Sequence, residues 1–330
     1  MNQSSNITIY PVILAAGKGT RMNLGRPSPV PKVLISLGGK PMVSYILETL
    51  KNLGTKELRN LKNTSEVKEV PHLGGVEGVV INKPTLVIGY KGEMIQKEFG
   101  DVCNYVWQRQ RLGTGHAARL AIEHIARNLK LDLGKSRLKP ANPKKIINNG
   151  YKNCYATNIN CSQPLLTNIN LVLILQGDDS AFYKTKTLEK IFEKHLREKA
   201  VLTFVTTHLP DAKNLGRVIR DKNNNVIDIV EKENMTSELE KFNEINCGAY
   251  LFNLDWGTRA IKKIKKHLKD GKEYPLPDII KIALLDSHFR GERSPHLGSG
   301  SSGVIAYEIP SSEWRGINSP EQLKLAEQNF

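Results

Sequence analysis

One stretch decides the fold: Ile7-Thr8-Ile9-Tyr10-Pro11-Val12-Ile13-Leu14, followed at once by Ala15-Ala16-Gly17-Lys18-Gly19-Thr20-Arg21-Met22. The first eight residues are apolar or β-branched, which is typical of a buried strand. Glycines directly after a first strand let backbone N–H groups approach phosphate oxygens, and Arg21 adds a fixed cation. The loop lacks the Gly-Lys-Ser/Thr of a Walker A motif. Met22 stands where a dinucleotide fingerprint needs its third glycine, which disfavours an NAD-dependent oxidoreductase.

Strands and helices are expected to alternate along the next two hundred residues. The apolar patterns predict strands at 7–14, 85–88, 105–107, 171–175 and 201–206, and helices at 41–53, 114–129 and 187–199, with a further helix that ends at Phe99. Gly54 is expected to end the first helix. Such alternation predicts an α/β fold, in which a Rossmann-like, mostly parallel sheet is flanked by helices.

The pattern changes after residue 209. Two strand-like runs, 217–220 and 226–230, are joined by Asp221 and the triplet Asn223-Asn224-Asn225, which indicates a hairpin. Another strand is expected at 246–252. We interpret residues 209–250 as a small antiparallel lid on the sheet, and residues 260–269 as an amphipathic helix with its lysines in solvent.

The chain is interpreted as a single domain over residues 1–330, with two insertions. Residues 55–83 are polar and contain glycine, and residues 133–170 are rich in Asn, Lys and Ser. Both are expected to be surface loops. No internal repeat is found.

The formal net charge of +15 favours anionic partners such as nucleotides and sugar phosphates, and most of the basic side chains are expected to lie on a solvated surface.

The four cysteines form no CxxC pair and are expected to be reduced thiols of a cytoplasmic protein, with a Cys154–Cys161 bridge as a remote alternative. No segment is long enough to span a bilayer, and no signal peptide is recognised. No helix-turn-helix, RNP or zinc pattern supports a nucleic-acid partner. The oligomeric state is left undefined.

Two further sequence motifs contain candidate binding residues. Lys32, after Pro31, is a candidate second cation for a triphosphate. Gln176-Gly177-Asp178 ends the central strand, and ligands of open α/β sheets bind at the carboxyl ends of strands. A carboxylate there suits a hard cation such as Mg2+. The structural alternative is that Asp178 caps the next turn.

The motifs together resemble a known family. Leu14 to Met22 with Pro31-Lys32-Val33-Leu34 is similar to the signature of sugar-nucleotide pyrophosphorylases, which are sugar-1-phosphate nucleotidyltransferases. Gln108-Arg109-Gln110-Arg111-Leu112-Gly113-Thr114-Gly115-His116-Ala117 resembles the uridine-reading stretch of the uridylyltransferase half of bacterial N-acetylglucosamine-1-phosphate uridylyltransferases (GlmU). The resemblance runs from about Val12 to Gln322 and implies a GT-A-like nucleotidyltransferase fold with the antiparallel lid over the sugar.

The resemblance also implies roles for individual residues. The catalytic residues would be Arg21, Lys32 and Asp178, and the metal ligands Asp178 and Asn318. The sugar would be bound by Gly216, Glu231 and Asn246, and the nucleotide by Leu14, Ala15, Ala16, Gly17, Gln108, Gly113 and Thr114. The amide of Gln108 offers a donor and an acceptor to uracil, and His116 is expected to be structural. A cap by Thr114 at a helix start is the alternative for that motif. For the Asn318 motif the alternative is a helix that begins at Ser319 and Pro320, and both interpretations can hold. Asp179-Ser180 replaces the family's small residue and proline.

The implied reaction joins UTP and N-acetylglucosamine 1-phosphate to give UDP-N-acetylglucosamine and pyrophosphate, with Mg2+ as cofactor. No covalent nucleophile is expected, because the sugar phosphate is already largely ionised at neutral pH. Another hexose 1-phosphate (glucose or galactosamine type) remains an alternative, as does a catalytically silent nucleotide-sugar sensor. The hexapeptide repeats of the acetyltransferase half of GlmU, which form a β-helix, are absent from this sequence, so acetyl transfer is not expected.

Overall fold

A computed structural model describes residues 6–23, 28–60, 78–131, 169–212, 215–266, 273–291 and 303–328. Most of the two expected insertions lies outside the described residues, and so do Cys154 and Cys161. Among the described residues, Cys103 and Cys247 are buried free thiols. No helix in these ranges is both long and apolar enough to cross a membrane.

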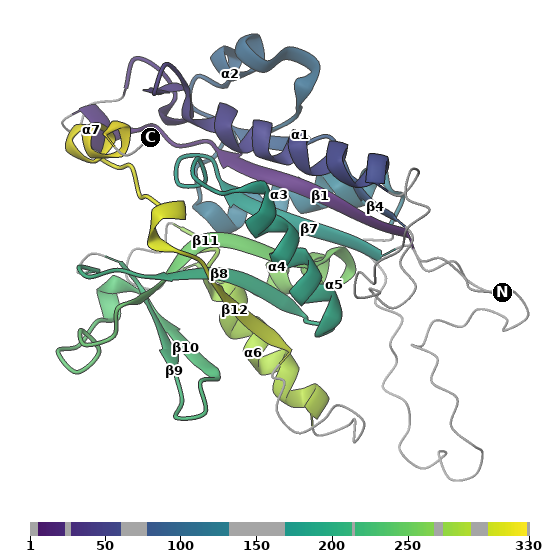
Figure 1. Cartoon of the computed structure of the whole chain (residues 1–330), viewed down its shortest axis with the longest axis vertical. Helices are drawn as coiled ribbons and strands as arrows, with labels where there is room; N and C mark the ends of the chain where they lie inside the picture. The colour runs from purple at the N-terminus through teal and green to yellow at the C-terminus, as the bar shows by residue number, and fades with distance from the viewer. Residues whose placement is uncertain are drawn as a thin grey trace, which may run out of the picture.

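A mixed sheet forms the centre of the molecule (Figure 1). Within the described residues it has ten strands, of which seven follow the order β10-β9-β11-β7-β1-β5-β6. Their bounds are β1 Asn6–Ala15, β5 Thr85–Ile88, β6 Asn104–Trp107, β7 Ile169–Gln176, β9 Arg217–Arg220, β10 Val226–Val230 and β11 Glu244–Asn253. Three more strands join this path, namely β4 Gly78–Ile81 beside β1, β8 Leu202–His208 beside β11, and β12 Val304–Glu308 beside β8. A separate two-stranded ribbon pairs β2 Ser36–Leu37 with β3 Lys40–Pro41.

Strands β1, β4, β5, β6 and β7 pair in parallel, which confirms the predicted mostly parallel fold. Strand β11 runs antiparallel to β7, so the start of β11 lies at the carboxyl end of β7. Strands β9 and β10 form the predicted antiparallel hairpin, joined to the sheet where Ile245 pairs with Arg217.

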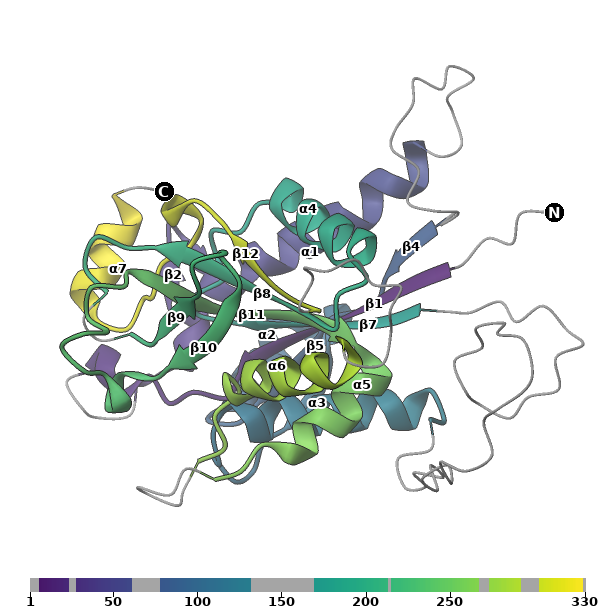
Figure 2. The same ribbon diagram turned by 90° about the horizontal axis from the view of Figure 1, so that it is seen from below.

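Helices cover both faces of the sheet, as the edge-on view of Figure 2 shows. Helices α1 (Met42–Asn60) and α4 (Thr185–Arg197) pack on one face, and α3 (Thr114–Asn128), α5 (Leu254–Ala260) and α6 (Asp278–Gly291) on the other. The shorter helices are α2 (Gly92–Phe99) and α7 (Pro320–Glu327). Single 3-10 turns occur at Thr20–Asn23, Lys32–Leu34, Gly100–Val102, Lys232–Asn234, Ile261–Lys263 and Ser311–Glu313. The sheet therefore has a hydrophobic core on each side.

Two local predictions are wrong, and so is the alternative that Thr114 caps a helix. Helix α1 does not end at Gly54 but continues to Asn60. The expected helix at 260–269 is replaced by α5, which begins at Leu254 because the Asn253 side chain accepts from the backbone N–H groups of Asp255 and Trp256. Only a 3-10 turn follows α5, and residues 267–269 lie outside the described part of the chain. Thr114 is the first residue of α3 and its cap is Gly113.

Five further strands and helices were not predicted, two of which are the short strands β2 and β3. Strand β4 lies in the expected insertion 55–83, and α6 and β12 fall in a region where only the start of α7 was anticipated. That start is confirmed, since the Ser319 hydroxyl accepts from the backbone N–H of Gln322 and Pro320 opens the helix.

His195 joins α4 to the sheet as a buried neutral group. Its Nδ1 lies 2.9 Å from the hydroxyl oxygen of Thr203 in β8, and only 3% of the residue is exposed. Burial lowers the pKa of His195 to about 4. The unfolded chain therefore binds this proton more readily than the folded one, and the folded state loses stability as the pH falls from about 6.5 toward 4.

We expect the free energy of unfolding of the wild type to fall by about 2 kcal/mol more between about pH 7.5 and pH 5 than that of His195→Gln, because only the wild type must protonate a buried imidazole. Urea unfolding at both pH values measures this difference. Equal slopes for His195→Gln and wild type would contradict the prediction.

Candidate active site

The carboxyl edge of the sheet gathers the predicted site residues in three groups. The first lies where β1, β5 and β6 end. Gln108 directly follows β6, and its backbone N–H donates to the carbonyl of Ile88 at 2.8 Å. A Cβ on Gly89 would lie 3.0 Å from the Cβ of Ala16 and 3.2 Å from the carbonyl oxygen of Gln108. The end of β1 and the Gln108 segment are thus held close together.

Leu14, Ala15, Ala16 and Gly17 complete the edge of this first group. Leu14 and Ala15 are the last two residues of β1 and lie between β5 and β7. A Cβ on Gly17 would meet nothing within 4 Å, so open space faces this part of the backbone. The loop after β1 therefore leaves space for a ligand to contact the main-chain N–H groups.

Gly113 and Thr114 pack on a segment that the sequence did not implicate. The Gly115 N–H donates to the carbonyl of Tyr274 at 2.8 Å, and the Tyr274 N–H donates to the carbonyl of Leu112 at 2.8 Å. The Thr114 hydroxyl accepts from the N–H of Leu276 at 3.0 Å. Nothing local in the sequence links residues 112–115 with 274–276, so only the tertiary contact could reveal this support.

The second group brings the predicted cations and metal ligands together. The Lys32 ammonium donates to Oδ2 of Asp178 and, at 2.9 Å, to Oδ1 of Asn318. Lys32 opens a 3-10 turn, Asp178 follows β7 and Asn318 precedes α7. The Asn318 N–H is itself held by the Gln322 side chain at 2.6 Å. An ammonium group already occupies the space between the two oxygens, so this pair of oxygens is suited to a cation.

Asp179 and Arg21 lie near Lys32 and Asp178. Burial, and then the neighbouring Asp178 carboxylate, raise the pKa of Asp179 well above its usual range, while Lys32 and Arg21 act in the opposite direction. Oδ1 of Asp179 is buried without a hydrogen-bond partner in the described structure. Arg21 is exposed in the 3-10 turn after the loop and lies close enough to influence Asp179. The two neighbouring acids therefore differ in their surroundings: Asp178 is paired with Lys32, whereas Asp179 lies in a less polar environment.

The third group lies around Tyr250 in β11. The Asn246 Nδ2 donates to the Tyr250 hydroxyl at 2.7 Å, and its Oδ1 accepts from the N–H of Gly248 at 3.1 Å. A register shift between Asn246 and Tyr250, with φ of 76° at Gly248, brings together side chains that a regular strand would hold about 13 Å apart at their Cα atoms. Sequence patterns did not indicate Tyr250.

Gly216 and Glu231 join the same group. A Cβ on Gly216 would lie 3.3 Å from Oε2 of Glu231. Burial raises the pKa of Tyr250, and the Glu231 carboxylate adds to that effect, so the two side chains are neighbours. A Cβ on Gly248 would come within 2.9 Å of Gln176, which links this group to the end of β7 two residues before Asp178.

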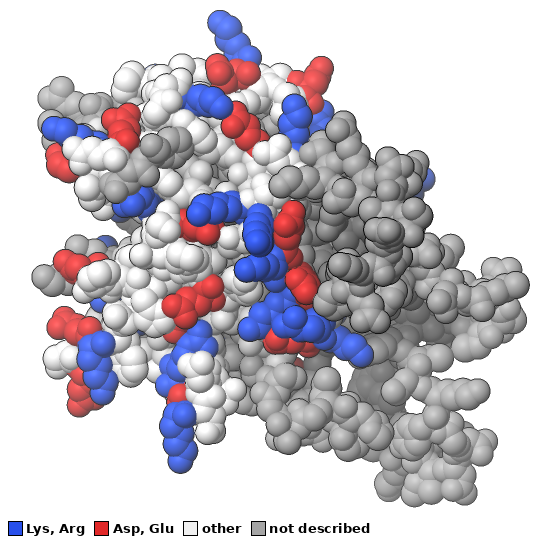
Figure 3. All heavy atoms as spheres, in the orientation of Figure 1, with Lys and Arg blue, Asp and Glu red and all other residues white. Residues whose placement is uncertain are grey.

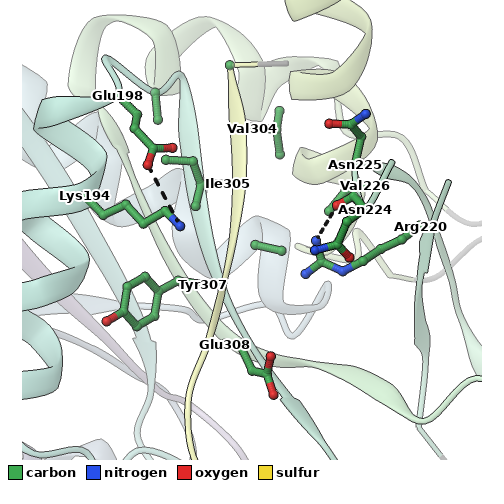
Figure 4. Close-up of a pocket in the computed structure, with 13 residues that line it drawn as sticks. Lys194, Glu198, Arg220, Asn224, Asn225, Val226, Val304, Ile305, Tyr307 and Glu308 are labelled. Carbon is green, nitrogen blue, oxygen red and sulfur yellow. Dashed lines mark hydrogen bonds and ion pairs between the residues drawn. The ribbon is translucent and has the colours of Figure 1, made fainter. Parts of the chain in front are cut away.

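A pocket of about 460 Å³ elsewhere in the fold contains none of these residues (Figure 4). It surrounds β12, between α4 and the β9–β10 hairpin. Its cations are engaged, since Lys194 lies 3.9 Å from Glu198 and Arg220 donates to both oxygens of Glu244. On the face drawn in Figure 3, basic side chains gather in a central band, with acidic side chains beside and among them. Neither feature points to another ligand.

An open α/β sheet with a glycine loop, cations and a carboxylate at its carboxyl edge suits the binding of a nucleotide or another phosphate ligand. The family model described as Nucleotidyl transferase matches residues 79–288, and the one described as MobA-like NTP transferase domain matches residues 11–86. The chain belongs to the nucleotidyl transferase family and is a nucleotidyltransferase.

Curated relatives agree with this family. The chain is 29% identical over 316 residues to the Bifunctional protein GlmU of Caldanaerobacter subterraneus subsp. tengcongensis, covering 96% of this chain and 50% of that protein. Identity to the Bifunctional protein GlmU of an Exiguobacterium species is 30% over 275 residues, covering 83% of this chain and 45% of that protein. The chain thus spans about half the length of the curated relatives it matches.

A solved structure is similar in fold. A crystal structure of a Bacillus anthracis protein assigned as a glucose-1-phosphate thymidylyltransferase, in complex with sucrose, superposes with a TM-score of 0.58 at 14% identity. The match covers 97% of this chain and 94% of the other. At this identity the likeness supports the fold alone.

Gly113→Ala tests the support of the first group by the Tyr274 segment. A Cβ at Gly113 would lie 2.6 Å from the Tyr274 carbonyl oxygen at a φ of 90°. Gly39 has a φ of 88° and nothing within 4 Å of such a Cβ, so Gly39→Ala carries the same backbone cost without the clash. We expect Gly113→Ala to lower the free energy of unfolding by about 1–3 kcal/mol more than Gly39→Ala and to weaken nucleotide binding. Denaturant unfolding and calorimetric titration with nucleotide measure both effects, and equal losses would refute the predicted clash.

Proposed function

We propose that the chain transfers UMP from UTP to N-acetylglucosamine 1-phosphate, giving UDP-N-acetylglucosamine and pyrophosphate. One observation carries the proposal, namely the order of the three groups along the carboxyl edge. The group at β5 and β6 suits a base and ribose, the group at β1 and β7 suits phosphates, and the group at β9 to β11 suits a pyranose. A nucleotide sugar has its parts in this order.

Mg2+ is the proposed cofactor. Asp178 and Asn318 would hold it, because a carboxylate and an amide oxygen are hard ligands and Mg2+ commonly takes only one or two protein oxygens beside substrate phosphates. The described residues contain no cluster of three or more His, Cys, Asp or Glu side chains suited to a metal, which agrees with such a sparse ligand set. When bound, the ion would neutralise charge on the phosphates.

The residues would act by alignment and charge. A phosphate oxygen of the sugar phosphate attacks the α-phosphorus of UTP, the bond from that phosphorus to the bridging oxygen breaks, and pyrophosphate leaves. Arg21 and Lys32 would stabilise the departing pyrophosphate, together with N–H groups of the loop after β1. No general base is required, because the attacking oxygen is already ionised.

The sugar would be held by Gly216, Glu231 and Asn246. Asn246 keeps one N–H after its bond to Tyr250, and Glu231 supplies carboxylate oxygens, so donors and acceptors of the kind that pyranose hydroxyls need are present. A Cβ at Gly216 would lie 3.0 Å from the carbonyl oxygen of Val230 and 3.3 Å from Oε2 of Glu231, so a larger residue there would require these neighbours to shift. The cytoplasmic location stays a prediction that rests on the cysteines.

Pyrophosphate release from UTP with a panel of sugar 1-phosphates tests the function directly. We expect release that is greatest with N-acetylglucosamine 1-phosphate and that stops when a chelator removes Mg2+ and resumes when Mg2+ is restored. A larger rate with a glucose or galactosamine derivative would keep the reaction and change the sugar. No release with any sugar from a folded protein that binds UTP would indicate a silent sensor.

Lys32→Ala tests the charge at the transferred phosphate. Because this side chain is 9% exposed and lies on both proposed metal ligands, we expect kcat to fall by at least about 100-fold. Lys40→Ala is the matched control, since Lys40 is half exposed on the short strand β3 and pairs with Glu48, and its kcat should stay within about twofold of wild type. A folded Lys32→Ala enzyme with near-normal turnover would remove Lys32 from the mechanism.

A further inference from the structure

The amide of Gln108 has a fixed orientation. The residue is 5% exposed, and its Nε2 lies 3.0 Å from the carbonyl oxygen of Gly113 and 3.2 Å from Nδ1 of His116. A backbone carbonyl only accepts hydrogen bonds, so the group facing Gly113 must be the amide NH2. The opposite orientation would place two acceptor oxygens against each other.

This orientation defines the state of His116. Because the Gln108 NH2 only donates, Nδ1 of His116 must accept, and the imidazole proton lies on Nε2. Burial and then the nearby Arg119 lower the pKa of His116, while a hydrogen bond to the backbone of Gln110 and the Glu123 carboxylate act in the opposite direction. The net direction favours the neutral ring that this contact needs.

Both amide protons of Gln108 are therefore used inside the protein. One goes to Gly113 and the other to His116, and no hydrogen bond to Oε1 is recorded from the described residues. The sequence suggested that Gln108 would offer a donor and an acceptor to a base. The geometry leaves the acceptor Oε1 for that purpose.

We propose that His116 is a positioning residue that holds Gln108 as an acceptor and so selects pyrimidine nucleotides whose ring N3 carries a hydrogen. Uracil and thymine present an N3–H donor, whereas the N3 of cytosine is an acceptor and would face Oε1 without a hydrogen bond. Rejection of such a base comes from the unpaired polar groups it would leave in the site. The inference rests on the proposed function only in placing the base at Gln108.

The test compares kcat/KM for UTP, dTTP and CTP in wild type, His116→Leu and His116→Asn, with the sugar phosphate held saturating. Asn and Leu have the same number of side-chain heavy atoms, branched at the same carbon, but only Asn keeps an acceptor oxygen near the position of Nδ1. We expect the wild type to prefer both UTP and dTTP over CTP. The UTP-to-CTP ratio should fall on the order of tenfold in His116→Leu and stay within about threefold of wild type in His116→Asn.

A purely structural His116 would give a different pattern. It would lower kcat/KM for all three nucleotides alike and leave their ratios unchanged, and that result would overturn the proposal. Equal loss of the ratio in both variants would also overturn it, because the acceptor would then not matter. If His116→Leu does not fold in a thermal unfolding assay, Gln108→Met asks the same question by removing the amide, and an unchanged ratio there would reject the role of Oε1.

Failure of this inference is distinguishable from failure of the proposed function. A wild type that prefers dTTP to UTP but rejects CTP would contradict UTP as the substrate and support the inference, since thymine carries the same N3–H. A wild type that prefers UTP, with variants that retain the wild-type ratio, would support the function and contradict the inference. A wild type that uses CTP as well as UTP would contradict the inference.

Discussion

The parallel pairing of β1 with β7 is the constraint on which the rest of the site depends. Residues 7–14 of β1 pair in continuous register with residues 169–176 of β7. Parallel strands end at the same edge, so the loop after Leu14 and the turn that carries Asp178 meet there. The antiparallel strand β11 then begins at that edge and brings Asn246 to the same side. Because this central register aligns three parts of the site at once, a slip of one residue would turn the side chains of one strand to the opposite face and disperse the site.

Lys32 adds an electrostatic constraint to this geometry. Its ammonium joins an acid after β7 to an amide before α7, and so links the two ends of the chain. The same two oxygens are the proposed metal ligands, so either the ammonium or Mg2+ would lie between them. A cation at this place balances the Asp178 carboxylate and lowers the cost of bringing like-charged phosphates there. The adjacent Asp179 has a raised pKa, chiefly from burial, which limits the negative charge that the site must balance.

Local sequence signals predicted the regular elements well where they were strong. Strands β5, β9 and β10 begin and end as expected, because apolar or β-branched runs are bounded there by polar residues, glycine or proline. Helix α5 was missed for a physical reason. Gly257 weakens its helical propensity, yet a Cβ there would clash with the Phe252 ring, so the glycine allows close packing that no local pattern reveals. Strand β12 was missed because its pairing with β8 joins residues a hundred positions apart.

The sequence by itself determined the class of fold, the glycine loop and the candidate site residues, because periodicity and short motifs are local properties of the chain. The roles of those residues were inferred from the resemblance to a known family. Only the tertiary structure decided which side chains meet. It placed Lys32 on Asp178 and Asn318, Tyr250 on Asn246, the Tyr274 segment under Gly113, and His116 on Gln108. Some of these contacts join distant segments, and the local ones depend on a β-bulge or a loop conformation, so their geometry is set by packing and not by spacing along the chain.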